Sequence, residues 1–355
     1  MKVIHARNVH QALPEALYQL ANEGVDRESR NGPVVMFPEP VTTVYEQPAE
    51  RVVFWPSRDA NPFFHLMESL WMLGGRNDVE FVARFVERMR SFSDDGVTFH
   101  GAYGHRWRVH FERDQLPGII DALKENPEDR RQVLSMWDAR VDLGRQGKDL
   151  PCNLQALFQI DHNGELVMMV TNRSNDMIWG AYGANAVHFS YLHEYVARSV
   201  GVPQGRYYQV SGNFHAYRDV LGKVADLVDC APDPVLPEEA RWAGLCPYMD
   251  ARVEPFPLMS TDRATWDADL EMFLDEGPVM GFRDPFFRRV AVPMMAAHKA
   301  FKETKGRERY AAALSILEDC EAEDWKLAAQ EWIDRRQEAY EERLRRAQDD
   351  GVSYE

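Results

Sequence analysis

The sequence lacks the features that would indicate an oxidising compartment, a membrane or a metal-stabilised fold. Its 355 residues include only four cysteines, Cys152, Cys230, Cys246 and Cys320, which lie far apart and without metal-ligand spacing. No stretch approaches the roughly 18 consecutive apolar residues that can span a bilayer. We therefore expect no disulfide, no bound metal and no membrane-spanning helix.

Positive charge is also scarce. The chain has 41 Lys and Arg against 57 Asp and Glu, which gives a net charge of -16 at pH 7. This charge opposes nonspecific binding to a nucleic-acid backbone, whereas a few clustered arginines can still hold one small anion. The segment from Met1 to Arg7 lacks the apolar run of a signal peptide, so we expect a cytoplasmic protein. A hydrophobic content of 45% is ample for a core.

Reactive and polar residues are concentrated between positions 148 and 219. Pro151 restricts the backbone just before the thiol of Cys152, and the apolar residues of 154–160 predict a strand directly after it. A second strand is expected over 165–171. Arg173 and Ser174 follow that strand and offer a forked cation and a hydroxyl, which together suit a phosphate.

Two further segments carry polar groups in apolar surroundings. His215 and Tyr217 alternate along one short strand, so they share a face. Glu68 lies in the middle of a helix expected over 61–73, among Phe64, Met67 and Trp71. A carboxylate desolvated in this way can exchange protons near neutral pH, although a boundary glutamate paired with an arginine would give the same pattern.

Apolar spacing predicts the remaining helices. An amphipathic helix is expected over 9–23, a mixed helix over 79–91, and a helix with a buried stripe over 185–199. His188 and His193 lie in the last of these but are five residues apart, so they do not form a metal pair. Charge-rich helices are expected over 293–303, 307–318 and 323–347. The aromatic and basic run from Tyr103 to Arg108 fits either a surface loop or the lining of a site.

Several of these segments together resemble the thymidylate synthase superfamily, which includes the pyrimidine-nucleotide hydroxymethylases. The similarity covers roughly residues 25–220 and consists of ordered, spaced motifs. In chain order the motifs are Glu68-Ser69-Leu70-Trp71, Tyr103-Gly104-His105-Arg106-Trp107-Arg108, Asp129-Arg130-Arg131, Pro151-Cys152, Arg173-Ser174-Asn175-Asp176 with Gly180 and Asn185, and Gly212-Asn213-Phe214-His215-Ala216-Tyr217.

The resemblance implies a fold and an assembly. The fold would be α/β (α+β) and thymidylate synthase-like, with a mixed twisted sheet at a dimer interface covered by helices. We expect a catalytic domain over 1–290 and a helical, charged extension over 291–355 packed on the same domain. Arg130 and Arg131 would reach across the interface to the partner's phosphate, which implies an obligate homodimer with shared sites.

The resemblance also implies roles for the motif residues. Cys152 would attack C6 of a pyrimidine 5'-monophosphate, and 5,10-methylenetetrahydrofolate would donate the one-carbon unit without any metal. The catalytic set would be Cys152, Glu68, Asp176 and Asn185. The phosphate would bind Arg30 (with Arg27 as a competitor), Arg173 and Ser174, and the sugar hydroxyl would bind His215 and Tyr217. Asp176, Trp179 and Gly180 would hold the folate.

The resemblance also implies how the base is recognised and how the thiol of Cys152 is activated. Asn185 matches the base-reading asparagine, whose amide can both donate to and accept from uracil, whereas a carboxylate would suit cytosine. The path from Gly180 to Asn185 is one residue longer than the family pattern, which could displace that amide. Arg173 would lie near the thiol of Cys152 and lower its pKa.

Three departures from the synthase pattern favour hydroxymethyl transfer to dUMP. The segments Phe92 to Asp95 and Phe99-His100 lack a tryptophan, Asp149 replaces an aliphatic residue three before the cysteine, and the chain ends in Gly351 to Glu355 rather than in a small apolar residue. These departures suggest that water reaches the transferred carbon. The alternatives are a thymidylate synthase, a dCMP hydroxymethylase and a catalytically silent nucleotide-binding homologue.

Overall fold

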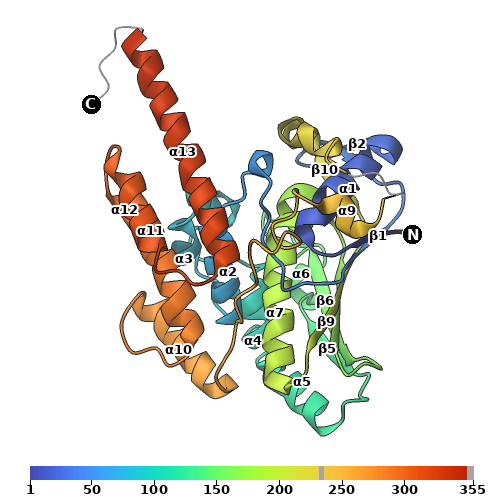
Figure 1. Ribbon diagram of the computed structural model, residues 1–355. Helices are drawn as coiled ribbons and strands as arrows, with labels where there is room; N and C mark the ends of the chain where they lie inside the picture. The colour runs from blue at the N-terminus through green and yellow to red at the C-terminus, as the bar shows by residue number, and fades with distance from the viewer. Residues whose placement is uncertain (232–235, 350–355) are drawn as a thin grey trace.

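The computed structural model describes residues 1–231 and 236–349, and it has the mixed α/β architecture expected from the sequence (Figure 1). Segment 351–355, used above as an argument against a synthase, lies outside the described residues. Within the described ranges, no helix is both long enough and apolar enough to cross a bilayer.

A six-stranded mixed sheet forms one side of the molecule. Its strands, in spatial order, are β1 (Lys2–Ala6), β4 (Val41–Tyr45), β9 (Gln204–Ser211), β7 (Leu166–Asn172), β6 (Asn153–Ile160) and β5 (Gln132–Ser135). The β1–β4 and β7–β9 pairs are parallel and the other pairs are antiparallel. The strands expected over 154–160 and 165–171 are therefore confirmed as β6 and β7. The structure adds that the two strands pair with each other.

Side chains alternate between the two faces of this sheet, as a strand requires. Met168 and Val170 of β7 are fully buried, whereas Met169 between them is half-buried. Figure 1 shows α7 (Asn185–Val200) along one face, with the other face turned outward. The hydrophobic core therefore lies between the sheet and the helices on the α7 side.

A second sheet, which the sequence analysis did not anticipate, lies apart from the first. Its strands are β2 (Val25–Ser29), β3 (Gly32–Met36), β10 (Phe214–Tyr217) and β8 (Asn175–Asp176). The strands are short and come from three distant parts of the chain. A single expected sheet therefore becomes two, because β10 pairs with β3 of the β2–β3 hairpin and β8 pairs with β10, instead of both extending the larger sheet.

The expected helices around the core are confirmed with one correction. The helices α1 (Val9–Glu23) and α2 (Pro62–Leu73) are capped by the side chains of Asn8 and Asn61. The expected helix over 79–91 is instead α3 (Val79–Ala83) followed by a separate 3-10 turn over Glu87–Phe92. None of the residues in that turn is buried, so no apolar stripe supports a continuous helix.

Shorter helices connect these elements. They are α4 (Tyr103–Arg108), α5 (Gln115–Glu125), α6 (Ala139–Asp142), α8 (Arg218–Leu221), α9 (Glu238–Trp242) and α10 (Arg263–Glu276). Two π-helical segments, η3 (Met177–Ala184) and η5 (Phe287–Ala291), run directly into α7 and into α11 (Val292–Glu303).

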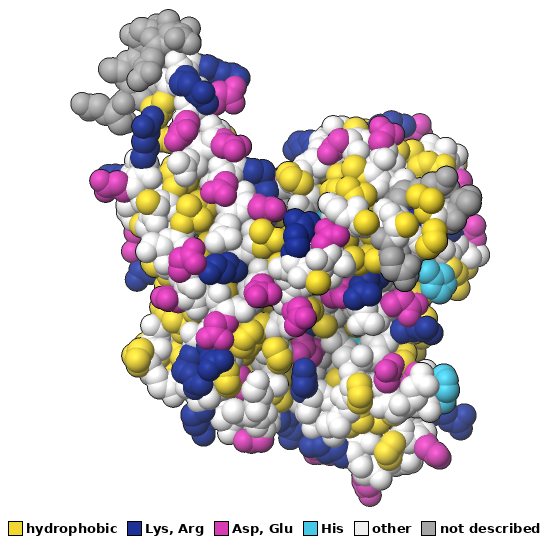
Figure 2. Space-filling view, viewed as in Figure 1, with side chains coloured by type: hydrophobic (Ala, Val, Ile, Leu, Met, Phe, Trp, Pro, Cys, Tyr) yellow, Lys and Arg dark blue, Asp and Glu magenta, His cyan; other side chains and the backbone are white. Residues whose placement is uncertain are grey.

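The C-terminal helices follow the expected boundaries closely. They are α11, α12 (Glu308–Leu317) and α13 (Glu323–Asp349). Aromatic contacts join them to α2, since the Phe63 ring lies 5.3 Å from His298 and 5.5 Å from Trp332. Farther along, α13 projects from the body of the molecule with charged side chains around it (Figure 2).

Candidate active site

Cys152 is held at the start of β6 by a tyrosine from α4. The backbone N–H groups of Cys152 and Asn153 donate to Oη of Tyr103 at 3.0 and 3.2 Å. The next residue, Gly104, approaches α2 so closely that a Cβ there would lie 1.9 Å from the carbonyl oxygen of Met72. The run from Tyr103 to Arg108 is thus part of the site's framework and not a surface loop.

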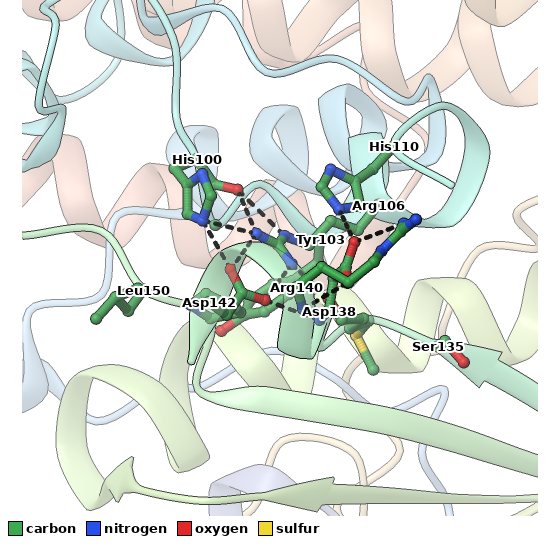
Figure 3. A network of polar contacts seen from close by, with 12 residues as sticks. His100, Tyr103, Arg106, His110, Ser135, Asp138, Arg140, Asp142 and Leu150 are labelled. Atoms are coloured by element: carbon green, nitrogen blue, oxygen red, sulfur yellow. Dashed lines mark hydrogen bonds and ion pairs between the residues drawn. The ribbon is translucent and has the colours of Figure 1, made fainter. Parts of the chain in front are cut away.

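The buried ion pair between Arg106 and Asp142 holds this framework in place (Figure 3). Arg106 is fully buried and donates to both carboxylate oxygens of Asp142 at 2.7 and 2.9 Å, and also to the carbonyl of Met136 at 2.7 Å. His100 Nε2 lies 2.7 Å from the same carboxylate. Burial pushes the pKa of Asp142 up, but hydrogen bonds from Arg106 and the Asp138 backbone hold it below its usual value.

The thiol of Cys152 is half-buried, and its pKa differs from the expectation. Burial raises the pKa above the ordinary thiol value, Arg173 and Arg30 lower it, and the Asp149 carboxylate raises it further. The expected lowering by Arg173 is present but is outweighed by desolvation. The pKa of Asp149 is itself raised by burial, and its Oδ2 accepts a hydrogen bond from the Gly101 N–H at 2.8 Å.

Two arginines flank the thiol. Arg173 donates to the carbonyls of Pro151 at 2.9 Å and Leu150 at 3.2 Å, and it is exposed. Arg30, at the tip of the β2–β3 hairpin, donates to the Gly147 carbonyl at 3.3 Å. Arg30, not its competitor Arg27, thus points to the cysteine loop. Ser174 follows Arg173 and is half-buried.

Arg130 and Arg131 lie elsewhere in the subunit. They precede β5, and the Arg131 side chain is 84% exposed and paired with Asp129 at 2.7 Å. Within the described residues, no hydrogen bond or ion pair links either arginine to the Cys152 loop. One subunit therefore does not bring all the expected phosphate ligands together.

The smaller sheet brings His215, Tyr217 and Asp176 together. His215 on β10 is opposite Asp176 on β8, and its ring lies 5.4 Å from that of Tyr217, which confirms that the two rings share a face. His215 Nδ1 is 2.8 Å from Oδ1 of Asn213. Burial lowers the pKa of His215, against the opposing effect of Asp176, and burial raises the pKa of Asp176.

Asp176 also begins the π-helical segment. Its Oδ1 accepts hydrogen bonds from the N–H groups of Ile178 and Trp179 at 2.9 and 2.6 Å, while its Oδ2 is buried without a partner among the described residues. The Arg58 guanidinium lies 4.4 Å from the centre of the half-exposed Trp179 ring and donates to the Ile178 carbonyl at 2.9 Å. An exposed aromatic ring and, three residues before it in the chain, an unpartnered carboxylate oxygen are groups that suit a flat heterocycle with N–H donors.

The path from Gly180 to Asn185, which is one residue longer than the family pattern, contains a kink at Tyr182 and Gly183, where the backbone is not helical. Asn185 begins α7 directly after this kink. Its Nδ2 donates to Oδ1 of Asn175 at 3.0 Å, and its Oδ1 accepts from Nδ2 of Asn153 at 3.3 Å. The amide is turned toward the cysteine strand and not away from it.

Glu68 meets a histidine that the sequence analysis did not select. Glu68 Oε2 lies 3.0 Å from Nε2 of His188, and the two side chains are only 12% and 4% exposed. Neither atom has a hydrogen-bond partner of good geometry among the described residues. This close pair of buried, unsatisfied atoms is suited to holding a water molecule or passing a proton.

Sequence reasoning missed four contacting residues, namely Arg58, Asn153, Asn175 and His188. His188 lies one turn after Asn185, so helical spacing could have placed it on the same face. Asn175 was inside a quoted motif but had no assigned role. Arg58 gave no local signal, because its contacts depend on a segment 120 residues away. In the described part of the chain, no cluster of three His, Cys, Asp or Glu side chains could hold a metal.

Comparison with known proteins gives several matches. Residues 15–238 match the family model described as thymidylate synthase. A Pseudomonas phage M6 protein named deoxyuridylate hydroxymethyltransferase is 71% identical over all of both chains. A Bacillus phage SP01 protein of the same name is 39% identical over 52% of this chain and 50% of that protein. A Streptococcus thermophilus thymidylate synthase is 28% identical over 63% of this chain and 77% of that protein.

Proposed function

The chain belongs to the thymidylate synthase family, as its motifs indicated, and we propose that it transfers a hydroxymethyl group to C5 of dUMP. The observation that carries this proposal is the full-length, 71% identity with the phage M6 deoxyuridylate hydroxymethyltransferase. The synthase relative is more distant and matches a smaller part of the chain. The product would be 5-hydroxymethyl-dUMP.

We propose that dUMP lies along the loop that carries Cys152. Its phosphate is bound by Arg30, Arg173 and Ser174, and the two arginines are already close enough to the thiol to act on its pKa. Among the described residues, both guanidiniums donate only to backbone carbonyls, so a phosphate offers them stronger, charge-assisted bonds. His215 and Tyr217, which share one face of β10, bind the sugar hydroxyl.

The chemistry starts at Cys152. Its thiolate adds to C6 of uracil and moves the C5=C6 electron pair toward O4, so C5 becomes nucleophilic. C5 then bonds the one-carbon unit of the folate. Loss of the C5 proton and cleavage of the bond from this carbon to the folate nitrogen release tetrahydrofolate and leave an exocyclic methylene on the ring. Because the resting thiol has a raised pKa, we expect Cys152 to be largely protonated until nucleotide binds.

Water completes the reaction. Its oxygen bonds the methylene carbon, its proton passes to a base, and the returning electron pair expels the Cys152 thiolate and restores C5=C6. We assign the base to Glu68, with His188 3.0 Å away to receive the proton. Asp149 places a polar group beside the thiol, where the synthase pattern has an aliphatic residue, and this supports the entry of water.

A reduced folate, 5,10-methylenetetrahydrofolate, would supply the one-carbon unit at the oxidation level of formaldehyde. The unpaired Oδ2 of Asp176 and the half-exposed ring of Trp179 fit its pterin ring. Gly180 keeps this wall free of a side chain. Arg58 would hold Trp179 in place from behind.

We propose that two subunits assemble through the outer face of the larger sheet. A row of residues in register crosses five strands of this face: Val133, Leu157, Met169, Tyr208 and Val44. Val133 is 42% exposed and the next three residues of the row are half-buried, whereas Val44 at its end is buried, so four neighbouring strands leave apolar side chains partly in water. Arg130 and Arg131, at the edge of this sheet, would then reach the partner's phosphate site.

The remaining proposals concern organisation and location. The division into a catalytic domain over 1–290 and a helical extension over 291–355 is supported by the packing of α11 and α13 on α2. A cytoplasmic location fits a deoxynucleotide and a folate as substrates.

The test of this proposal identifies which folate product the reaction forms. The protein, dUMP labelled with tritium at C5, and methylenetetrahydrofolate are mixed, and tritium release is compared with the folate product. Hydroxymethyl transfer predicts tetrahydrofolate in equal amount to the released tritium, because no hydride leaves the folate. Stoichiometric dihydrofolate would instead identify a thymidylate synthase.

A further inference from the structure

Four side-chain amides form a continuous hydrogen-bonded chain that ends beside Cys152; we call it the amide chain. Nδ2 of Asn175 donates to Oε1 of Gln209 at 3.1 Å and to Oγ of Ser211 at 3.2 Å. Only the contact with Gln209 fixes the direction of the Asn175 amide, because a hydroxyl can either donate or accept. Nδ2 of Asn185 donates to Oδ1 of Asn175 at 3.0 Å, and Nδ2 of Asn153 donates to Oδ1 of Asn185 at 3.3 Å. The members come from β9, β8, α7 and β6, so the chain joins both sheets to the first turn of α7.

The far end of the amide chain sets its direction. Nε2 of Gln209 faces the carbonyl oxygen of Ala181 at 3.5 Å and Oη of Tyr207 at 3.0 Å. A carbonyl can only accept, so the NH₂ group of Gln209 points to it and Oε1 points to Asn175. Each later amide must then keep its oxygen toward the following donor. Asn185 is the third link, so its orientation is set from outside the site.

Burial makes this direction costly to reverse. Gln209 is 1% exposed, Asn175 is 4% exposed and Asn153 is fully buried. Rotating the Asn185 amide by half a turn would put its NH₂ against that of Asn153 and its oxygen against that of Asn175. The hydrogen bond to the buried Asn175 would be lost and replaced by a repulsive contact between two oxygens. Asn153, whose Oδ1 has no partner among the described residues, would have to turn as well to keep its bond to Asn185.

The groups that Asn185 leaves unused match uracil. Its amide has two N–H donors and two lone pairs, and the amide chain uses one of each. One donor and one acceptor therefore remain for the base, which suits O4 and N3–H of uracil. Cytosine presents a donor and an acceptor in the exchanged positions, so it would require the rotated amide.

We propose that Gln209 and Asn175 are specificity-determining positioning residues that lock Asn185 in the orientation that prefers uracil to cytosine. The inference rests on the proposed function only in taking a pyrimidine nucleotide as the ligand. Gly180 belongs to the same device, since a Cβ there would lie 2.8 Å from Oδ1 of Asn175 and 3.4 Å from Nδ2 of Asn185. A bare backbone is needed where these two amides meet.

The test measures dissociation constants of dUMP and dCMP by calorimetry on the full-length protein without folate. Gln209→Met removes the anchor of the amide chain at similar volume. We expect the preference for dUMP to fall about five- to tenfold, because the lost lock lets Asn185 rotate. Gln204→Met is the matched control. It lies on the same strand, its amide donates to the Ser190 carbonyl at 3.2 Å and not to the amide chain, and its dUMP preference should stay at the wild-type value.

A double-mutant cycle separates positioning from general damage. In an Asn185→Ala background, Gln209→Met should leave the dUMP:dCMP ratio unchanged, because the residue through which it acts is gone. A structural defect would weaken both nucleotides alike in either background. If Gln209→Met fails to fold, Gly180→Ala replaces it, and its added methyl should lower the same ratio by parting Asn175 and Asn185.

The results have distinct meanings. A wild-type protein without preference for dUMP, or a ratio unchanged in Gln209→Met and Gly180→Ala, would overturn the inference. The inference would also be overturned if Gln209→Met changed the dUMP:dCMP ratio equally in the wild-type and Asn185→Ala backgrounds. None of these binding results depends on the product, so formation of a methyl product would refute the proposed hydroxymethyl transfer and leave the amide chain standing.

Discussion

The smaller sheet and the C-terminal helices differ in how the chain builds them. The smaller sheet joins residues 25–36, 175–176 and 214–217, and with them come Arg30, Asp176, His215 and Tyr217. The helices α11, α12 and α13 follow one another directly and carry none of the proposed site residues. The proposed site residues are thus concentrated where distant segments of the chain pair, whereas the helices that pack around them follow from local hydrophobic periodicity.

Removing the thiol should separate chemistry from binding. Cys152→Ala should lower turnover by about 10⁴-fold or more, since no other side chain can form the bond to C6. The affinity for dUMP should persist, because Arg30 and Arg173 hold the phosphate independently. Calorimetry and tritium release measure the two effects. Cys230→Ala, a second half-buried thiol outside the site, is the control and should remain active.

Changing the base reader should alter the choice of substrate. Asn185→Asp replaces the amide donor by an acceptor, which favours the amino group of cytosine over O4 of uracil. A lost or gained pair of this kind is worth about 1–3 kcal/mol, so the ratio of kcat/KM values should move about 5- to 150-fold toward dCMP. An unchanged ratio would show that the base is read elsewhere.

Mixing two inactive proteins should restore activity if sites are shared. Arg131→Ala and Cys152→Ala are unfolded together and refolded. In half of the resulting dimers one site combines both intact residues, so about a quarter of all sites should be active. Each protein refolded alone provides the baseline. Absence of recovery in verified heterodimers would contradict the placement of Arg131 in the partner's site.

The C-terminal helices should affect stability and not specificity. Asp324, fully buried at the start of α13, has its pKa raised by burial from the usual 3.8 to about 6, and its Oδ2 accepts from Tyr248 Oη at 2.9 Å. The raised pKa gives stability that is full below pH 3.8 and is lost as the pH rises through 6. Relative to Asp324→Asn, the wild type should therefore lose about 2–3 kcal/mol of unfolding free energy over this range.

Urea denaturation at several pH values measures this difference. Asp334→Asn, on the exposed side of the same helix, is the control and should track the wild type throughout. The dUMP:dCMP ratio should be unaffected by either change. A pH-independent difference between wild type and Asp324→Asn would count against the buried acid as its source.

The candidate site residues and most helices were predictable from the sequence, whereas the tertiary contacts around them were not. The motifs identified Cys152, and the helical periods placed α1, α2, α7 and the C-terminal helices, because both signals are local. The second sheet was missed, since β8 is only two residues long and its pairing depends on β10, about 40 residues later. The motif comparison favoured Arg30 over Arg27, and the hairpin adds the contact of Arg30 with the Gly147 carbonyl, which no local pattern reports.

The corrections within the site have the same cause. Arg173 was expected to lower the pKa of Cys152, but the desolvation that outweighs it arises from packing that no local pattern reports. The extra residue before Asn185 left the direction of its amide open in the sequence, whereas the structure turns this amide toward Asn153 and Asn175. The contact between Glu68 and His188 required α2 and α7 to be docked.

The source of the new oxygen tests the central claim most directly. The reaction of dUMP with methylenetetrahydrofolate is run in water enriched in ¹⁸O, and the nucleotide product is examined by mass spectrometry. Hydroxymethyl transfer predicts a product with one heavy oxygen in the new side chain, because water captures the methylene. A 5-methyl product without additional oxygen would contradict the account.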